Sequence, residues 1–250
     1  MNRIIKRCDE REILSTYNKE TVAYYHNFRR KGTFMNDYLI APRLRTLLKS
    51  KIFGKDVLDL GCGFGKDVEW CLKNGAKSVM GIEINKDFIS IARKNLSLSD
   101  VEIVNSSIYD AEKVNKKFDV IYSNMVFDQV QDLDLVFRKI SSLLKKGGKI
   151  IFVAPHPLST VTGDYSKFFD NYFVGRKVYH VPKSHNNRLP CYTRTFGDYS
   201  KLFYENNLCI EEIVEPKPSA CSKKIFPAAY DIYTKLPSVV IFSLSKKENG

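Results

Sequence analysis

Residues 55–155 alternate five short apolar runs with segments of helical spacing, and this alternation restricts the fold more than any other feature. The runs are DVLDL (56–60), SVMGIEI (78–84), VEIVNS (101–106), FDVIYSN (118–124) and KIIFVAP (149–155). Short apolar strands that alternate with helices are typical of a parallel sheet that is covered on both faces. The sequence therefore predicts an α/β fold built on a doubly wound sheet.

The segments between the apolar runs are expected to be helices. They are residues 66–75, 85–96 and 132–148. Gly75 and the pair Gly147–Gly148 stand where C-terminal caps belong, because glycine adopts positive φ without strain. Residues 10–50 also show helical spacing and are expected to form two helices rich in Tyr and Arg.

A chain of 250 residues is long enough for one domain with its own core. We expect a single domain with four parts: an N-terminal helical arm (1–54), the core (55–155), an irregular aromatic stretch (156–195) and a closing helix with two strands (196–250). An irregular stretch of this length is uncommon in a compact domain unless it covers a site.

The net charge of +12 is distributed unevenly along the chain. Residues 1–55 hold 13 Lys and Arg against five Asp and Glu, whereas residues 56–155 hold 14 of each. A basic arm could hold phosphates or an anionic substrate. The alternative is an ordinary solvated basic face.

The sequence also indicates a compartment. The N-terminus has early acidic residues and no apolar signal segment, and no run approaches the roughly 18 apolar residues of a membrane span. The six cysteines are scattered without a CxxC pair. We therefore expect a reduced, cytoplasmic protein without a metal site and without a membrane partner.

Three glycines, Gly61, Gly63 and Gly65, follow the first strand within five positions. Glycine at such a turn indicates positive φ or a ligand too close for a Cβ. A helix that begins after the turn directs its unpaired N–H groups at whatever the turn holds. Ligands of open parallel sheets bind beyond the carboxyl ends of the strands. The turn is therefore the predicted ligand site.

The carboxylate beside the turn distinguishes between two possible ligands that each contain a nucleoside. A dinucleotide fingerprint reads G-x-G-x-x-G, but here the third glycine comes one residue early and Asp59 precedes the turn. A carboxylate there repels a pyrophosphate and suits a cation, such as the sulfonium and ammonium groups of S-adenosylmethionine (SAM). Glu83 ends the second strand, where a carboxylate can bind both ribose hydroxyls.

These stretches resemble a known family. DLGCGFG and GAKSVMGIEINKDFISIARKN resemble motifs I and II of class I SAM-dependent methyltransferases, and FDVIYSNMVFDQVQDLDLVFRKISSLLKKGG resembles the fourth strand, helix and turn. The resemblance covers residues 55–155 and continues loosely, through HPL, FDNYF, TRTFGDY and EPKP, toward bacterial small-molecule methyltransferases. It implies a Rossmann-like, mostly parallel seven-stranded sheet with a lid over the acceptor at 156–195.

The resemblance also implies a cofactor site. Its residues are Asp59, Gly61, Cys62, Gly63, Gly65, Glu83, Ile84, Ser107, Ile108, Asn124 and Met125. In this site Glu83 binds the ribose, Ile84 packs on adenine, and Asn124 and Met125 lie under the sulfonium. Ser107 stands where the family usually has an Asp that binds the adenine amino group. Cys62 is expected to be a small residue that fits the turn.

The acceptor side is predicted from the segments that can cover this end of the sheet. His156 directly follows the fifth strand and is the candidate base or acceptor contact, with a structural His–Pro turn as the alternative. The candidate substrate-binding residues are Tyr17, Tyr24, Tyr25, His156, Tyr172 and Arg194. Arg194 lies in Thr193-Arg194-Thr195, where the related group often reads H-R-T. We expect the acceptor between residues 15–35 and 156–195.

Methyl transfer from a sulfonium is an in-line displacement, so no side chain has to act as a nucleophile. The resemblance implies a methyltransferase that acts on an N or O atom of a small molecule and leaves S-adenosylhomocysteine (SAH). One alternative is an RNA methyltransferase whose basic arm holds phosphates. The other is a SAM-binding protein without an acceptor site.

Overall fold

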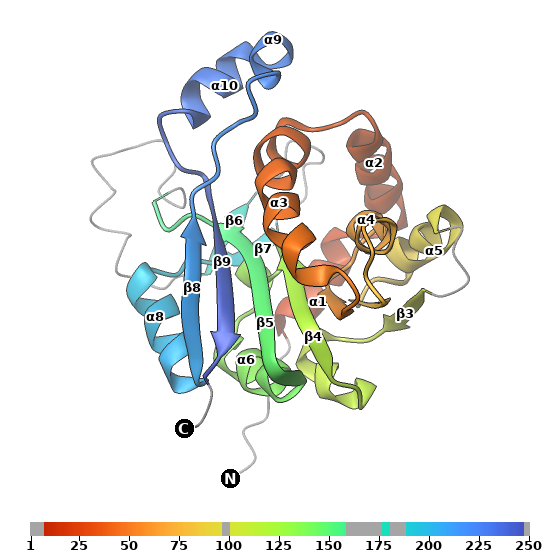
Figure 1. The fold of residues 1–250 in the computed structure, drawn as a ribbon. Helices are drawn as coiled ribbons and strands as arrows, with labels where there is room; N and C mark the ends of the chain where they lie inside the picture. The colour runs from red at the N-terminus through yellow and green to blue at the C-terminus, as the bar shows by residue number, and fades with distance from the viewer. Residues whose placement is uncertain (1–7, 97–100, 159–176, 181–188, 248–250) are drawn as a thin grey trace.

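The computed structural model describes residues 8–96, 101–158, 177–180 and 189–247. Its central sheet has the strand order β3-β2-β1-β4-β5-β9-β8 (Figure 1). The strands are β1 (Asp56–Leu60), β2 (Ser78–Glu83), β3 (Glu102–Asn105), β4 (Phe118–Asn124), β5 (Leu144–Pro155), β8 (Leu208–Val214) and β9 (Val239–Lys246). The first five are parallel, and β9 runs antiparallel between β5 and β8. The predicted seven-stranded, mostly parallel sheet is confirmed.

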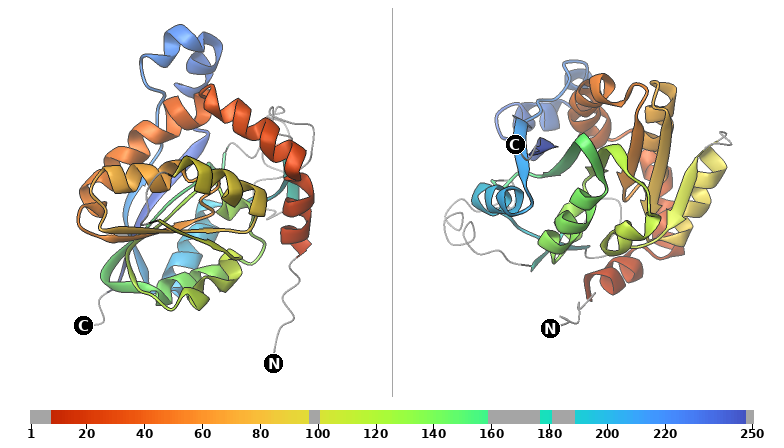
Figure 2. Two further views of the ribbon diagram at one scale, coloured as in Figure 1. Left: turned by 90° about the vertical axis from the view of Figure 1, so that its right-hand side faces the viewer. Right: turned by 60° about the horizontal axis from the view of Figure 1, so that its bottom comes forward.

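Helices cover both faces of this sheet (Figure 2). One face carries α3 (Ala41–Ile52), α4 (Lys66–Lys73) and α5 (Lys86–Asn95); the other carries α6 (Leu133–Ser142), α8 (Phe196–Glu205) and the 3-10 segment Ile108–Val114. Each face buries its own apolar cluster, as the uninterrupted apolar strands predict. Within the described residues, no helix has the length and apolar character to cross a membrane.

The N-terminal arm forms more helix than the two segments expected. It contains α1 (Cys8–Thr16), α2 (Lys19–Arg30), a π-helical segment (Phe34–Ile40) and α3. Asn18 caps α2, because its side chain accepts the N–H of Thr21. Pro42 lies in the first turn of α3, where proline is tolerated because an N–H there needs no partner within the helix.

The boundary between α6 and β5 differs from the expected one. The helix ends at Ser142, and the strand begins at Leu144, so Gly147–Gly148 lie within the strand and cap no helix. Pairing with β4 explains the difference, because Phe118 donates its N–H to the Leu143 carbonyl and pairs with Leu144. Gly75 does follow α4 with φ of +90°, as predicted.

Two parts of the chain depart from expectation after β5. The stretch 156–195, expected to be irregular, contains the hairpin strands β6 (Lys177–His180) and β7 (Leu189–Tyr192), whereas residues 159–176 and 181–188 lie outside the described ones. Two short helices, α9 (Ser222–Ile225) and α10 (Pro227–Tyr233), were not expected between β8 and β9. They stand beside the N-terminal arm, and Phe226 packs edge-on against Phe34 (Figure 1).

Candidate cofactor and acceptor site

The glycine turn after β1 has the predicted left-handed backbone. Gly61, Gly63 and Gly65 have φ of +76°, +53° and +74°. A Cβ on Gly61 would lie 2.5 Å from Val126 Cγ2, and one on Gly65 would lie 2.9 Å from Leu96 Cδ1. A Cβ on Gly63 would meet no protein atom within 4 Å. Two of the glycines are therefore required by packing, and the third faces open space.

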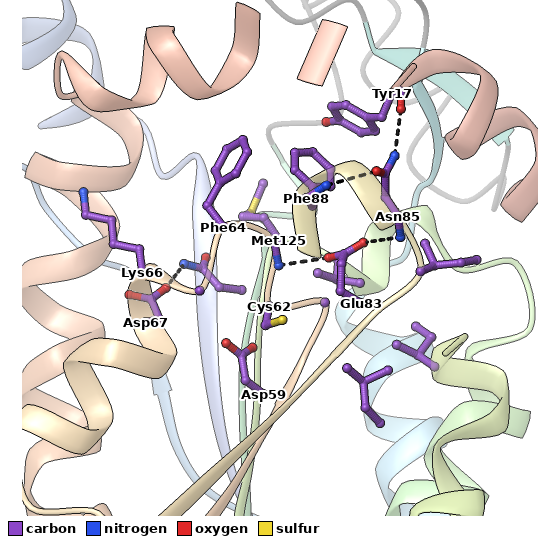
Figure 3. Close-up of a pocket in the computed structure, with 18 of the residues that line it drawn as sticks. Tyr17, Asp59, Cys62, Phe64, Lys66, Asp67, Glu83, Asn85, Phe88 and Met125 are labelled. Atoms are coloured by element: carbon purple, nitrogen blue, oxygen red, sulfur yellow. Dashed lines mark hydrogen bonds between the residues drawn. The ribbon is translucent and has the colours of Figure 1, made fainter. Parts of the chain in front are cut away.

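That open space is a pocket of about 480 Å³ at the carboxyl ends of β1, β2 and β4 (Figure 3). Its volume lies in the usual range for small-molecule sites. It is lined by all eleven residues predicted to contact a cofactor: Asp59, Gly61, Cys62, Gly63, Gly65, Glu83, Ile84, Ser107, Ile108, Asn124 and Met125. The order of the strands explains this meeting, because the chain reverses its direction of winding between β1 and β4.

Glu83 closes the turn from the end of β2. Its Oε2 accepts the N–H of Gly63 at 2.9 Å, and its Oε1 accepts the N–H of Asn85 at 2.9 Å. Burial raises the pKa of this carboxyl group, and the backbone N–H groups of Asn85, Gly63 and Ile84 partly offset the effect. Each carboxylate oxygen keeps a further lone pair for a ligand hydroxyl.

Asp59 places a second carboxyl group at the floor of the pocket. It is 2% exposed, and its Oδ2 accepts the hydroxyl of Tyr122 at 2.8 Å. Burial first, and then the neighbouring Asp67 and Glu83, raise the pKa of Asp59 well above its usual value. A carboxyl group in this condition gains most from a cationic ligand.

Asn124 and Met125 complete the floor at the end of β4. Asn124 Nδ2 donates to Asp67 Oδ2 at 3.2 Å, whereas its Oδ1 is buried and has no hydrogen-bond partner among the described residues. An ammonium group in the pocket would supply the missing donor. Met125 has φ of +58°, a strained conformation for a residue with a side chain.

Aromatic rings form the roof of the pocket. Tyr17, at the junction of α1 and α2, packs on Phe88 at 5.2 Å between ring centroids and on Tyr25 at 5.9 Å. Phe64 from the glycine turn meets Phe88 at 4.7 Å. Asn85 Nδ2 donates to the Tyr17 carbonyl at 2.7 Å and holds this junction over the site (Figure 3).

Not every predicted acceptor residue reaches the pocket. Tyr17 and Tyr25 line it, but Tyr24 is 55% exposed and does not. Arg194 also lies elsewhere: its guanidinium donates to the carbonyls of Phe127 and Val130 and so holds the loop after β4. Tyr172 lies outside the described residues.

His156 does not line this pocket. It is fully buried. Its Nδ1 accepts the N–H of Leu158 at 3.1 Å, so Nε2 carries the proton and donates to Glu215 Oε1 at 2.8 Å. Phe196 packs edge-on against the ring. These contacts are the ones expected of a structural His–Pro turn, the alternative to a base, and a role in acceptor binding stays a prediction.

Several lining residues were missed by the motifs. The main ones are Glu10, Ile13, Arg29, Arg30, Asn36, Phe64, Asn85, Phe88 and Gln129. Phe64 and Asn85 stand next to predicted residues and could have been found from their place after strands 1 and 2. Glu10 and Arg29 come from the N-terminal arm, where no local pattern points toward the pocket.

The fold and this pocket define a class I methyltransferase, and comparisons with known proteins agree. Residues 53–192 match the family described as "Methyltransferase domain", which is more than half of the chain. The chain therefore belongs to this family. The predicted resemblance to SAM-dependent methyltransferases of class I is confirmed, and SAM is the cofactor of that class.

The alignments with curated relatives cover part of this chain. An uncharacterized protein of Haemophilus influenzae is 29% identical over 154 residues, which cover 59% of this chain and 60% of that protein. The ubiquinone biosynthesis O-methyltransferase of Pelagibacter ubique is 34% identical over 128 residues, 50% of this chain and 49% of that enzyme. The aligned part thus spans less than two thirds of either relative. These relatives give no support to the RNA alternative.

A solved structure shows the same fold over most of the chain. The putative SAM-dependent methyltransferase of Listeria monocytogenes aligns with a TM-score of 0.67 at 23% identity, covering 83% of this chain and 98% of that one.

Proposed function

We propose that this protein binds SAM in the pocket and transfers its methyl group to an N or O atom of a small molecule. The observation that carries the proposal is the convergence of all eleven predicted cofactor residues on one pocket. The unpaired Asn124 Oδ1 supplies an acceptor for the ammonium group of SAM, and a bound cation would favour the ionised form of the buried Asp59 carboxyl group.

In this assignment each part of the pocket has a separate task. Glu83 accepts the ribose hydroxyls while it holds the turn through Gly63. Asn124 Oδ1 accepts a hydrogen bond from the ammonium group, and the Asp59 carboxylate contributes negative charge beneath it. Bound SAM supplies an electrophilic methyl group, and the protein contributes orientation and exclusion of water.

The aromatic roof favours a small acceptor. Tyr17, Tyr25, Phe64 and Phe88 line the pocket and pack on one another, and such an aromatic surface suits a flat or apolar molecule. Burial raises the pKa of Tyr17, so its hydroxyl remains protonated at neutral pH and can orient an acceptor by hydrogen bonding. The Pelagibacter ubique relative, an O-methyltransferase by name, supports the same class of reaction.

We also propose that the reaction takes place in the cytoplasm. The five cysteines whose side chains the structure describes form no disulfide, as a reducing compartment requires. Fractionation of cells that express the tagged full chain tests this placement. Recovery in a membrane or extracellular fraction would contradict it.

Two measurements test the proposed reaction. Calorimetry of the full chain with SAM and SAH should show binding to a single site. Incubation with methyl-labelled SAM and a fractionated metabolite pool should then place the label in small molecules, with an RNA pool assayed in parallel. Absence of SAM binding, or label found in RNA alone, would overturn the proposal.

A further inference from the structure

Glu10 brings a carboxylate from helix α1 to one end of the pocket. Its Oε1 accepts a hydrogen bond from Ser107 Oγ, and Ser107 is the N-cap of the 3-10 segment Ile108–Val114 that follows β3. Ser107 Oγ also accepts the N–H of Tyr109 at 3.0 Å. Since that hydroxyl has a single proton, the proton points to Glu10. In this pair Ser107 is therefore the hydrogen-bond donor and Glu10 the acceptor.

The pair lies at the end of the pocket where a base attached to the ribose belongs. Glu83 pairs with Asn105 across β2 and β3, so Ser107 lies two residues beyond the position level with Glu83. Ile84 and Ile108 line this same end. If the ribose is held at Glu83, the attached base extends between these two side chains toward Glu10.

The hydrogen-bonding groups at this end match an aminopurine. The hydroxyl of Ser107 donates its only proton in the hydrogen bond to Glu10, so it cannot also donate to the ring. The carboxylate of Glu10 offers acceptor lone pairs for an exocyclic amino group.

We propose that Glu10 accepts a hydrogen bond from the 6-amino group of the adenine of SAM. The N-terminal helix then supplies the acidic group for the base, and Ser107 orients it. This assignment rests on the proposed function, since it requires that SAM occupies the pocket. It makes Glu10 a specificity-determining residue for the base, although it stands 97 residues before Ser107 in the chain.

Binding of two ligands to the wild type and to several variants tests the proposed contact between Glu10 and adenine. Calorimetry measures the affinity of the full chain for SAH and for the SAH analogue with hydrogen in place of the 6-amino group. In the wild type the analogue should bind about tenfold to hundredfold more weakly, the effect of losing a hydrogen bond to a charged group. In Glu10→Ala the two ligands should differ by less than about threefold.

Two further variants separate the contact from other effects. Glu10→Gln keeps an uncharged acceptor, so its preference for SAH should fall between those of the wild type and Glu10→Ala. Glu20→Gln removes an exposed acid of α2 outside the pocket and should keep the wild-type preference. Circular dichroism of each variant checks that it is folded.

The outcomes distinguish the two proposals. If the wild type binds neither ligand, the proposed function fails. If the wild type binds SAH and the analogue equally, the inference is overturned. It is also overturned if Glu10→Ala binds both ligands more weakly but keeps the wild-type ratio of their affinities, because Glu10 then only tethers α1 to Ser107. A ratio that approaches one only in Glu10→Ala supports the contact.

Discussion

At the scale of single residues, the middle glycine of the turn differs from its neighbours. Gly61 and Gly65 leave no room for a Cβ because protein atoms lie within 3 Å of that position. Gly63 has no such neighbour, yet it lies in the pocket wall and donates its N–H to Glu83. A side chain at Gly63 would therefore enter the cofactor space and would not displace the protein.

We expect Gly63→Val to abolish SAM and SAH binding, with affinity lowered at least 100-fold, because the new side chain occupies the ligand volume. The left-handed backbone should cost about 1–2 kcal/mol of stability. Gly54→Val is the matched control, because Gly54 has φ of +68°, no neighbour within 4 Å and no place in the pocket. Calorimetry and thermal unfolding measure both effects. Near-native affinity in Gly63→Val would refute the role of the turn.

Asp59 should make the stability of the cofactor-free protein depend on pH. Its folded pKa is raised, so between the unfolded value near 4 and the folded value the native state binds more protons than the unfolded state. The free energy of unfolding should therefore fall as pH rises through this window, by at most about 1.4 kcal/mol per pH unit.

Asp59→Asn should remove that slope while keeping an acceptor for the Tyr122 hydroxyl. Cationic ligands favour the ionised carboxylate, so SAM should bind the wild type more tightly as pH rises, and Asp59→Asn should flatten this dependence. Denaturant unfolding and calorimetry between pH 5 and 8 provide the measurements, at ~0.5-unit steps. Identical slopes in the two proteins would assign the pH dependence to other groups.

At the scale of secondary-structure elements, Asn85 connects the core to the N-terminal arm. Its Oδ1 caps α5 by accepting the N–H groups of Asp87 and Phe88 at 2.8 and 3.2 Å. Its Nδ2 donates to the Tyr17 carbonyl between α1 and α2. One side chain thus begins a helix and positions the aromatic roof.

Two substitutions separate these tasks. Asn85→Ser keeps a capping oxygen but loses the donor to Tyr17, whereas Asn85→Ala loses both. We expect Asn85→Ala to lower the free energy of unfolding by about 1 kcal/mol relative to Asn85→Ser. Both should weaken SAH binding about equally, as measured by calorimetry. Wild-type affinity in Asn85→Ser would show that the link to Tyr17 does not position the roof.

At the scale of the whole molecule, the pocket has walls from the core and a cover from the N-terminal arm. Asp59, Glu83 and Asn124 come from strand ends, whereas Glu10 and Tyr17 come from helices that precede the sheet in sequence. Ligand entry and order in this arm should therefore be linked.

Hydrogen exchange should detect this link. Saturating SAH should slow amide exchange in α1 and α2 by about tenfold or more, because the ligand adds contacts to helices that cover it. Helix α10, which contributes no pocket residue, is the internal control and should be unchanged. Equal protection of α2 and α10 would indicate global stabilisation and would contradict a specific cover.

The sequence by itself determined the sheet core and predicted which residues of the core meet in the pocket. Local patterns suffice there: a parallel strand requires a short apolar run, and the positive φ of Gly63 requires glycine in a turn. Asp59, Glu83 and Asn124 could be assigned because each lies at or next to the end of a strand, and parallel strands end at one edge of the sheet. The type of each of these residues and its position within a few residues of a motif were therefore enough to predict its place.

Only the tertiary structure decided the remainder, because those contacts join residues that no local spacing relates. The hydrogen bond of the His156 ring to Glu215, 59 residues away, could not be predicted from the sequence around either residue. The end of α6 depended on the pairing of Leu144 with Phe118 in another strand. Glu10 reaches the pocket because the N-terminal arm packs against the core. The physical reason is that apolar surfaces far apart in sequence are buried against one another. Which surfaces meet depends on the assembled fold and not on neighbours in sequence.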